Sequence, residues 1–310
     1  MKALITGCAG FIGSHLTERF LENNEVIGMD CFADYYPREV KEENMSGFIN
    51  NPRFHFMEED ILKTDLEKIL PQVDIVYHIA AQAGVRASWG ENFKIYTDND
   101  ILATQRLLEA CKGKKLKKFV YSSSSSVYGD VKSLPMKETD MPRPISPYGV
   151  SKLAGEHLCN LYHKNFGIPV ISLRYFTVYG PRQRPDMAFN RFVKAIESGG
   201  EIKIFGDGKQ TRDFTFVSDI VDGTINAGES SINDGAFNLA GGSRISVLEV
   251  ISILEELTGK KAKLKHIDAQ KGDVRDTYGD ISKSQNILGY KPKVKIRDGL
   301  ERYIEWLRPR

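Results

Sequence analysis

The amino-acid sequence predicts an α/β protein built on a doubly wound parallel sheet. Over residues 1–180, short apolar runs typical of buried parallel strands alternate with longer segments of helical period. A glycine-rich turn follows the first apolar run and opens the first helical segment. Helices that cross over between parallel strands produce this alternation, so we expect one sheet with helices on both faces.

The elements of this sheet can be placed along the chain. Apolar runs predict strands at Ala3–Thr6, Val26–Asp30, Phe54–Met57, Ile75–Ile79, Phe119–Ser122 and Val170–Arg174. Helical periodicity predicts crossover helices at Phe11–Asn23, Asn92–Lys112 and Pro147–Phe166. After Gly180, glycine and proline interrupt the pattern, so we expect residues 181–310 to form mainly a smaller α/β lobe, with later segments near residues 214–240 returning to the first domain.

Composition excludes several classes of protein. The chain has 310 residues, 41% hydrophobic and 27% charged, with a formal net charge of +2, as expected for a folded protein of one or two domains. Its basic residues form no stripe interleaved with aromatic residues, so we expect no nucleic acid partner. No apolar run is long enough to cross a membrane, and the first strand starts at once, so we expect neither anchor nor signal peptide.

The cysteines and histidines indicate the compartment and the absence of a metal site. Cys8, Cys31, Cys111 and Cys159 lie far apart, which fits neither a zinc site nor the disulfide framework of a small secreted domain. The histidines show no pair at metal-ligand spacing. We therefore expect a cytoplasmic protein without a metal.

The glycine-rich turn is the first candidate functional feature. Gly7, Gly10, Phe11, Ile12 and Gly13 lie between strand and helix, where glycines let backbone N–H groups approach a diphosphate. The spacing G-x-x-G-x-x-G differs from the dinucleotide fingerprint G-x-G-x-x-G, but the flanking strand and helix agree with it. This predicts a Rossmann-type domain over residues 1–180.

Asp30 at the end of the second strand predicts which dinucleotide binds. A carboxylate there accepts hydrogen bonds from the adenosine ribose hydroxyls and repels a 2′-phosphate, so NAD is favoured over NADP. Asp60 and Ile61 follow the third strand and either line the adenine or cap the next helix. Ala80 and Ala81 end the fourth strand at the same edge of the sheet.

Tyr148 and Lys152 are candidate catalytic residues. They are four positions apart on an expected helix, so both side chains lie on one face. An adjacent ammonium and the positive nicotinamide would stabilise the phenolate and make Tyr148 a usable base. Taken alone, this spacing also fits a pair of surface side chains; the upstream dinucleotide loop favours the catalytic interpretation.

Several ordered motifs together resemble a known family. They are Gly7–Gly13, Asp30, Ser124 within Ser122–Ser126 before Val127-Tyr128-Gly129, Tyr148 with Lys152, Arg174–Pro181 and Gln210–Val217. In this combination the chain is similar to extended short-chain dehydrogenase/reductases, specifically the nucleotide-sugar 4-epimerases that act on UDP-glucose or UDP-glucuronate. The resemblance covers nearly the whole chain.

The resemblance implies a mechanism. Tyr148 would take the proton of the sugar 4-hydroxyl while C4 gives hydride to NAD, and Ser124 would hydrogen-bond the same oxygen. The 4-keto sugar would then turn over and take the hydride back on its other face, with Lys152 tuning Tyr148 and holding a ribose hydroxyl. The family's usual Asn near the following helix aligns with Asp100, and Asn99 beside it is a candidate cofactor contact.

Other activities of the same superfamily are weighed against epimerisation. In 4,6-dehydratases and uronic-acid decarboxylases, acidic residues precede the V-Y-G motif; here these places hold Ser125 and Ser126. A hydroxyl cannot replace a carboxylate base, so we favour epimerisation over a dehydratase, decarboxylase or reductase activity. A non-catalytic NAD-binding regulator remains the alternative outside enzymes.

Residues 181–310 are expected to bind the UDP-sugar. By the resemblance, Arg212 and Arg275 would clamp the diphosphate, and Phe205 would contact uracil; surface ion pairs and a core position are the competing interpretations. Arg86, Arg184 and Thr177 match the UDP-glucuronate 4-epimerase subgroup, in which Arg184 would hold the C6 carboxylate with Thr177 and Ser126.

The competing interpretation of the C6 region has Arg86 and Arg184 pairing with acids such as Asp186 and shaping a loop. UDP-glucose and UDP-galactose then remain substrates. The resemblance also implies a homodimer through helices 92–112 and 147–166, with Leu102, Leu108, Leu153 and Leu161 available for the interface.

Overall fold

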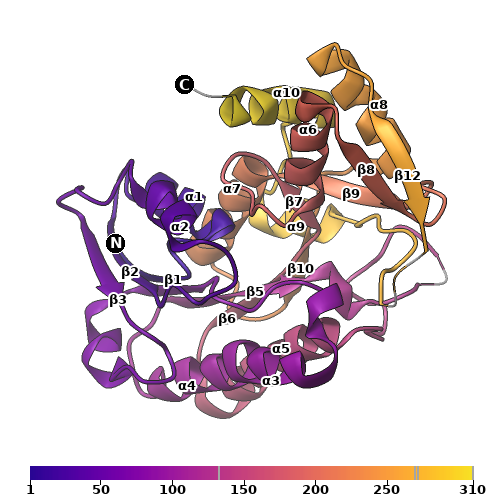
Figure 1. Cartoon of the computed structure of the whole chain (residues 1–310). Coiled ribbons are helices and arrows are strands. Elements are labelled where there is room, and N and C mark those ends of the chain that lie inside the picture. Colours follow the sequence, from indigo (N-terminus) through magenta and orange to yellow (C-terminus); the bar gives the residue numbers. More distant parts are fainter. Residues whose placement is uncertain (132, 269, 271, 309–310) are drawn as a thin grey trace.

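The computed structural model describes residues 1–131, 133–268, 270 and 272–308. Its centre is a seven-stranded parallel sheet in the order β10-β6-β5-β4-β1-β2-β3 (Figure 1). The strands are β1 (Lys2–Thr6), β2 (Glu25–Asp30), β3 (Phe54–Glu58), β4 (Ile75–His78), β5 (Lys118–Ser124), β6 (Val170–Tyr175) and β10 (Ala236–Leu239). Each neighbouring pair is parallel, which confirms the predicted fold class.

Helices cover both faces of this sheet. Figure 1 shows α3 (Phe93–Tyr96), α4 (Ala103–Ala110) and α5 (Pro147–Phe166) below it, and α1 (Phe11–Phe20), α2 (Arg38–Met45) and α7 (Val217–Glu229) above it. α5 begins at the Ser146 cap, whose hydroxyl accepts the Gly149 N–H at 3.1 Å, and ends at Gly167, which has φ of 69°. The α5 limits agree with those predicted from the sequence.

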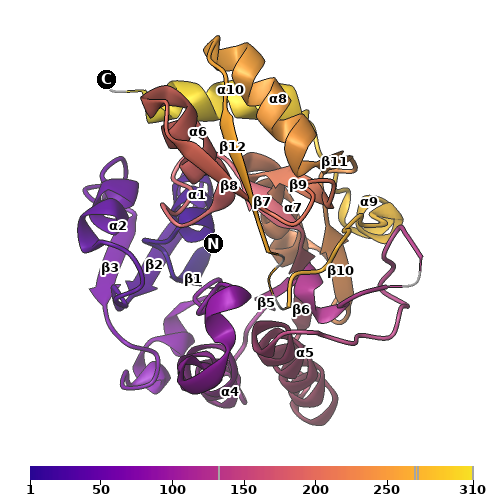
Figure 2. The ribbon, with the colours of Figure 1, turned by 45° about the vertical axis from the view of Figure 1, so that its right-hand side comes forward.

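The remaining elements form the second lobe and short turns. Two small sheets are formed by β7 (Thr177–Tyr179), β9 (Thr211–Phe216) and β11 (Arg244–Ser246), and by β8 (Glu201–Phe205) and β12 (Lys263–Ile267). The helices of this part are α6 (Ala188–Ser198), α8 (Val247–Thr258), α9 (Ser282–Leu288) and α10 (Ile296–Leu307). Figure 2 shows α6, α8, α10, β8 and β12 together on one side of the large sheet. After β9 the chain forms α7, which packs against α1, and then β10.

The expected helix Asn92–Lys112 is divided. Within it the structure has α3, a π-helical segment η5 (Thr97–Leu102) and α4. A π-turn contains about one more residue than an α-turn, and a pattern read with a period of 3.6 predicts one continuous helix and does not place such an insertion. Strand β5 also runs past its predicted end, because Ser122, Ser123 and Ser124 pair with β6. Polar side chains in a strand end conceal that extension.

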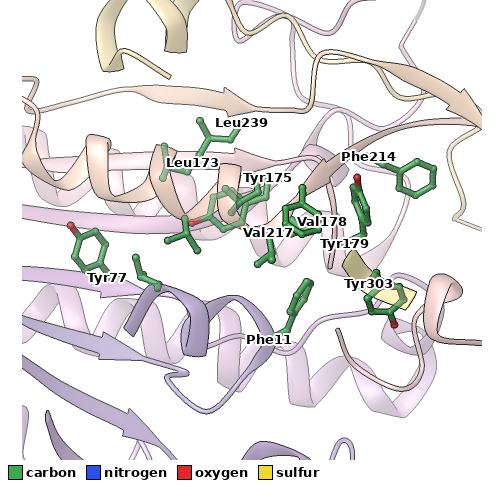
Figure 3. Close-up of a cluster of buried hydrophobic side chains, with 14 of the residues drawn as sticks. Phe11, Tyr77, Leu173, Tyr175, Val178, Tyr179, Phe214, Val217, Leu239 and Tyr303 are labelled. Atoms are coloured by element: carbon green, nitrogen blue, oxygen red, sulfur yellow. The ribbon is translucent and has the colours of Figure 1, made fainter. Parts of the chain in front are cut away.

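One apolar core joins the large sheet to the second lobe. Figure 3 shows Tyr77, Leu173, Tyr175 and Leu239 of the sheet continuing through Val178 and Val217 to Tyr179, Phe214 and Tyr303. The rings of Phe189 on α6 and Phe214 on β9 are 4.6 Å apart, and Tyr179 packs on both. This continuous packing fixes the second lobe relative to the carboxyl ends of the sheet strands.

Two of the expected interface leucines face inward instead. Leu108 is fully buried in the core beneath the sheet, and Leu153 is half-buried against the cluster around Val127 and Phe176. Leu102 and Leu161 are exposed. The prediction for Leu108 and Leu153 was therefore wrong, because helical period alone does not distinguish the core-facing stripe from a second apolar stripe.

Candidate functional site

A large cavity lies at the carboxyl ends of the sheet strands, where ligands bind in open α/β sheets. The predicted residues that line it are Gly7, Gly10, Phe11, Ile12, Gly13, Asp30, Asp60, Ile61, Ala80, Ala81, Asn99, Ser124, Ser125, Ser126, Tyr148, Lys152, Thr177 and Arg184. Arg86, Phe205, Arg212 and Arg275 do not line it. The cavity therefore brings together the expected cofactor and catalytic residues but not all expected substrate residues.

The glycine loop forms a cradle that admits no larger side chain. Gly7 has φ of +72°, and a Cβ there would lie 2.8 Å from the Ala80 nitrogen. A Cβ on Gly13 would lie 1.9 Å from the Gly7 carbonyl oxygen. The first turn of α1 is thereby pressed against the end of β1, with its N–H groups toward the cavity. Such a helix start suits the diphosphate of a dinucleotide.

The Asp30 carboxylate is fixed at the other end of the loop. One of its oxygens accepts the Ala9 N–H at 3.1 Å, and the other accepts the Phe32 N–H at 2.9 Å. Burial raises the pKa of Asp30, while the Phe32 N–H and the nearby Lys41 ammonium act in the opposite direction. Each oxygen can accept a further bond, so the site fits the ribose of NAD.

Asp60 lines the cavity but does not cap the next helix, because the helical segment that follows, η1 (Leu66–Lys68), has Asp65 as its N-cap. The Asp60 carboxylate accepts the Leu62 N–H at 2.9 Å within a turn. A local turn and a contact with the adenine are therefore compatible.

Ser124, Tyr148 and Lys152 meet at the inner end of the cavity. Ser124 ends β5, and the other two residues lie on the first turns of α5. The Lys152 ammonium donates to the Ser122 carbonyl at 2.8 Å and lies 5.1 Å from the centre of the Tyr121 ring. Helix α5 packs directly on β5, which sets this arrangement.

The pKa of Tyr148 differs from the sequence-based expectation. Burial and, to a smaller extent, the Asp100 charge raise the pKa of Tyr148 to about 12, while hydrogen bonding by Ser124 acts in the opposite direction. Burial lowers the pKa of Lys152, while Asp100 raises it. The cause is the surroundings: the Lys152 ammonium is directed at the Ser122 carbonyl, and the carboxylate near both residues is Asp100.

Arg184 faces the same cavity from the second lobe. Its Nε and Nη2 donate to the two Asp186 oxygens, both at 3.0 Å, and its guanidinium lies 5.2 Å from the centre of the Tyr35 ring. The acidic partner is the one weighed in the competing interpretation of the sequence. Asp186 engages the edge of the guanidinium formed by Nε and Nη2, which does not include Nη1.

The remaining four predicted substrate residues form a second cluster. Arg86 pairs with Asp273 at 2.6 Å and lies 3.9 Å from the centre of the Phe205 ring. Arg212 donates to the Val274 and Arg275 carbonyls at 2.7 and 2.8 Å. Arg275 pairs with Asp207 at 3.2 Å and is exposed. The sequence shows none of these partners, because they come from distant segments.

Several cavity residues lay outside the sequence-based prediction. Tyr35, Tyr36 and Lys41 follow β2, and Gln82 and Tyr175 follow or end β4 and β6. Their positions next to strand carboxyl ends were the available signal. No sequence motif marks Tyr35 and Tyr36, because their contact with the second lobe depends on tertiary packing.

Comparisons with known proteins agree with this geometry. Residues 3–240 match the NAD dependent epimerase/dehydratase family. The chain belongs to this family. That membership confirms the predicted resemblance and the prediction of an NAD-dependent enzyme.

Several relatives of this chain are named as epimerases. A UDP-glucuronate 4-epimerase of Thermodesulfobacterium geofontis is 41% identical over 98% of this chain and 95% of its own length. An uncharacterised UDP-glucose epimerase of Bacillus subtilis is 46% identical over 99% and 98%. The UDP-glucuronic acid 4-epimerase of Bacillus cereus, in complex with UDP-glucuronic acid and NAD, superposes with a TM-score of 0.96 at 50% identity over 99% and 98%.

The described helices and side chains also bear on membrane spans and metal sites. Of the helices in residues 1–131, 133–268 and 272–308, none has the length and apolar character needed to cross a membrane. In the same described part of the chain, no group of three or more His, Cys, Asp or Glu side chains is arranged to hold a metal ion.

Proposed function

We propose that this family member is an NAD-dependent UDP-hexose 4-epimerase with Ser124, Tyr148 and Lys152 as its catalytic residues. The observation that supports it best is the meeting of these three side chains in the cavity that the glycine loop and Asp30 also line. The relatives named as 4-epimerases support the same reaction.

Each residue has a distinct part in the reaction. When bound, NAD supplies a hydride acceptor at C4 of the sugar and returns the hydride after the 4-keto sugar has turned over. Tyr148 removes the 4-hydroxyl proton and later gives one back, and the Ser124 hydroxyl donates to the same oxygen as charge develops there. Lys152 holds a ribose hydroxyl and, as an ammonium, favours the tyrosinate.

Replacing Tyr148 tests this assignment. Tyr148→Phe should lower kcat for UDP-sugar epimerisation by roughly 10²- to 10⁴-fold, because it removes the proton acceptor without changing the shape of the site. Tyr162→Phe is the matched control: Tyr162 lies on the same helix, outside the cavity, and should retain its activity. A Tyr148→Phe enzyme with most of its kcat would refute the assignment.

Elimination reactions find no suitable base in this cavity. Its acidic lining residues are Asp30, Glu59 and Asp60, which follow β2 and β3 at the adenosine end. The positions beside Ser124 hold Ser125 and Ser126, whose hydroxyls do not ionise near neutral pH. Epimerisation is therefore favoured over dehydration or decarboxylation.

The C6 group of the preferred sugar is a carboxylate, as in UDP-glucuronate. Arg184 and Thr177 line the cavity together with Ser126, and the Nη1 edge of Arg184 is not engaged by Asp186. Tyr35 stacks on the guanidinium and limits its freedom. A charge-assisted contact to a carboxylate contributes roughly 1.5–3 kcal/mol, which is about tenfold to a hundredfold in specificity.

An arginine pair separates this preference from a structural role. Arg184→Ala should lower kcat/KM for UDP-glucuronate about tenfold to a hundredfold more than for UDP-glucose. Arg182→Ala is the control, because Arg182 is paired with Glu18 at 2.8 Å and does not line the cavity. Arg182→Ala should change kcat/KM for UDP-glucuronate and for UDP-glucose by the same factor. Equal losses for the two sugars in Arg184→Ala would reject the uronate preference.

The cluster of Arg86, Phe205, Arg212 and Arg275 binds the nucleotide. Arg212 and Arg275 suit a diphosphate, and Phe205 offers a ring face to uracil. Phosphate oxygens would replace the present partners of these two arginines, which are the Val274 and Arg275 carbonyls and the Asp207 carboxylate. Arg212→Ala should raise KM for each UDP-sugar without changing the choice between them.

The enzyme is a cytoplasmic homodimer of two lobes, residues 1–180 with 214–240 and the rest of 181–310, except that β7 and the end of β9 pair within the small sheet of the second lobe. Val150 and Leu161 on α5, with Ile95 and Leu102 beside them, expose 45–53% of their surface. Eleven residues are about three helical turns, so Val150 and Leu161 share one face. Leu161→Asp should give a monomer by light scattering, and Ile287→Asp, equally exposed on α9, should leave the dimer intact. A monomeric wild type would refute the proposed dimer.

Cys8, Cys31, Cys111 and Cys159 are free cysteines, which supports the proposal of a reducing compartment such as the cytoplasm.

A further inference from the structure

Asp100 is a buried carboxyl group directly behind the catalytic residues. It lies in η5, the π-helical segment, and is 1% exposed. The backbone N–H of Gln82, which lines the cavity, donates to its Oδ1 at 2.7 Å. The Ser151 hydroxyl lies 2.6 Å from the Asp100 Oδ2 and 2.8 Å from the Tyr148 carbonyl oxygen, and its single proton can be donated to one of these two acceptors at a time. Because Ser151 immediately precedes Lys152, Asp100 links the cavity wall to the catalytic turn of α5.

The titratable groups near the Asp100 carboxyl group come from several elements. Lys152 and Tyr148 face it from α5, Tyr96 from α3 and Tyr121 from β5. Of these, Lys152 is the cation. The other carboxylate near Lys152, Glu156, is already engaged by Nε and Nη2 of the Arg174 guanidinium.

The direct contacts of Lys152 supply no charge. Its ammonium donates to a carbonyl oxygen, that of Ser122, and faces the ring of Tyr121. His78, on β4, is also near Lys152 but lies between the hydroxyls of Thr6 and Thr104 at 2.8 and 3.0 Å. A buried ammonium without a counterion is costly, so a negative charge on Asp100 would stabilise the charged form of Lys152.

We propose that Asp100 is the ionised counterion of Lys152, a positioning residue that keeps this ammonium charged and thereby sets the pH range in which Tyr148 and Lys152 work together. The proposal rests on the proposed function of these two residues. Asn has nearly the same shape as Asp without the charge, so an Asp100→Asn variant separates the charge of this side chain from its size.

The direction of the effect follows from electrostatics. A negative charge disfavours the tyrosinate and favours the ammonium, so Asp100 raises the pKa of both Tyr148 and Lys152. Burial raises the pKa of Asp100 itself, while Lys152 and the Ser151 and Gln82 donors lower it. Removing the charge should move both titrations to lower pH.

Asp100→Asn tests the proposal in the whole enzyme. We expect both limbs of the kcat–pH profile to move to lower pH by about one unit. The tyrosinate absorbance of Tyr148, taken as the difference from the same protein with Tyr148→Phe, should move in the same direction without any substrate. Ser151→Ala removes one hydrogen bond to Asp100 but not its charge, and Asp100→Glu retains the charge, so both should leave the limbs close to wild type.

The outcomes distinguish a charge from a structural role. A folded Asp100→Asn protein with unchanged limbs and unchanged tyrosinate titration would overturn the proposal, because Asp100 would then be neutral. If Asp100→Asn does not fold, nitrogen NMR of the wild type decides: the Lys152 signal, identified by its loss in Lys152→Met, should be that of an ammonium at neutral pH, and a neutral amine would overturn the proposal. A shifted titration in a protein inactive on UDP-sugars would refute the proposed function instead.

Discussion

The Glu156 carboxylate and the Arg174 guanidinium form a bidentate ion pair behind the serine strand, with Nε–Oε1 at 2.9 Å and Nη2–Oε2 at 2.7 Å. Both side chains are less than a tenth exposed. The Ser123 hydroxyl donates to the same Glu156 oxygen at 2.5 Å, and the guanidinium lies over the Tyr128 ring. The pair thus ties α5, which carries Tyr148, to β5 and β6.

Replacing one partner of this ion pair should destabilise the fold more than replacing both partners. Glu156→Ala leaves a buried guanidinium without a partner and should lower the free energy of unfolding by about 3–5 kcal/mol. The double variant Glu156→Leu with Arg174→Met should be far closer to wild type, because neither charge remains. Urea unfolding measures both. A double variant as unstable as Glu156→Ala would show that the ion pair itself contributes most of the stability.

The glycine loop should tolerate no methyl group at position 13. Because a Cβ there would overlap the Gly7 carbonyl, Gly13→Ala must displace the turn that receives the diphosphate. We expect loss of measurable NAD binding by calorimetry. Gly47→Ala is the control, since its Cβ would meet only the flexible end of Glu18. Unchanged NAD affinity in Gly13→Ala would place the cofactor elsewhere.

His78 should make the fold sensitive to acid. Burial and Lys152 lower its pKa to about 3, below the value of about 6.5 in an unfolded chain. The unfolded state therefore binds the extra proton first, and His78 removes stability as pH falls below about 6.5, by roughly 1.4 kcal/mol per pH unit. His78→Gln should flatten the dependence of unfolding free energy on pH between about 6 and 4. His55→Gln is the control, because His55 is exposed, and it should leave this dependence unchanged. An unchanged pH dependence of the unfolding free energy in His78→Gln would contradict the role given to His78.

The sequence predicts the sheet and the residues of the cavity better than the surroundings of the second cluster, Arg86, Phe205, Arg212 and Arg275. Strand and helix positions follow from local periodicity, and Gly7, Asp30, Tyr148 and Lys152 occupy motifs with fixed spacing. The ion pair of Arg86 with Asp273 joins residues 187 positions apart, which no local pattern encodes.

The electrostatic surroundings were also beyond the sequence. The high pKa of Tyr148 depends on burial and on Asp100, and the position of Asp100 depends on a π-turn that periodicity does not register. Motifs identify which groups react, whereas tertiary packing decides their protonation.

Epimerisation at C4 by this route requires that the enzyme retain the hydride. Incubation of the NAD-loaded protein with UDP-glucuronate in deuterated water, followed by proton NMR of the sugar, shows whether it does. We predict the C4 epimer with hydrogen, not deuterium, at C4, because the hydride leaves and returns without meeting solvent. Deuterium at C4, or a dehydrated or decarboxylated product, would contradict the account.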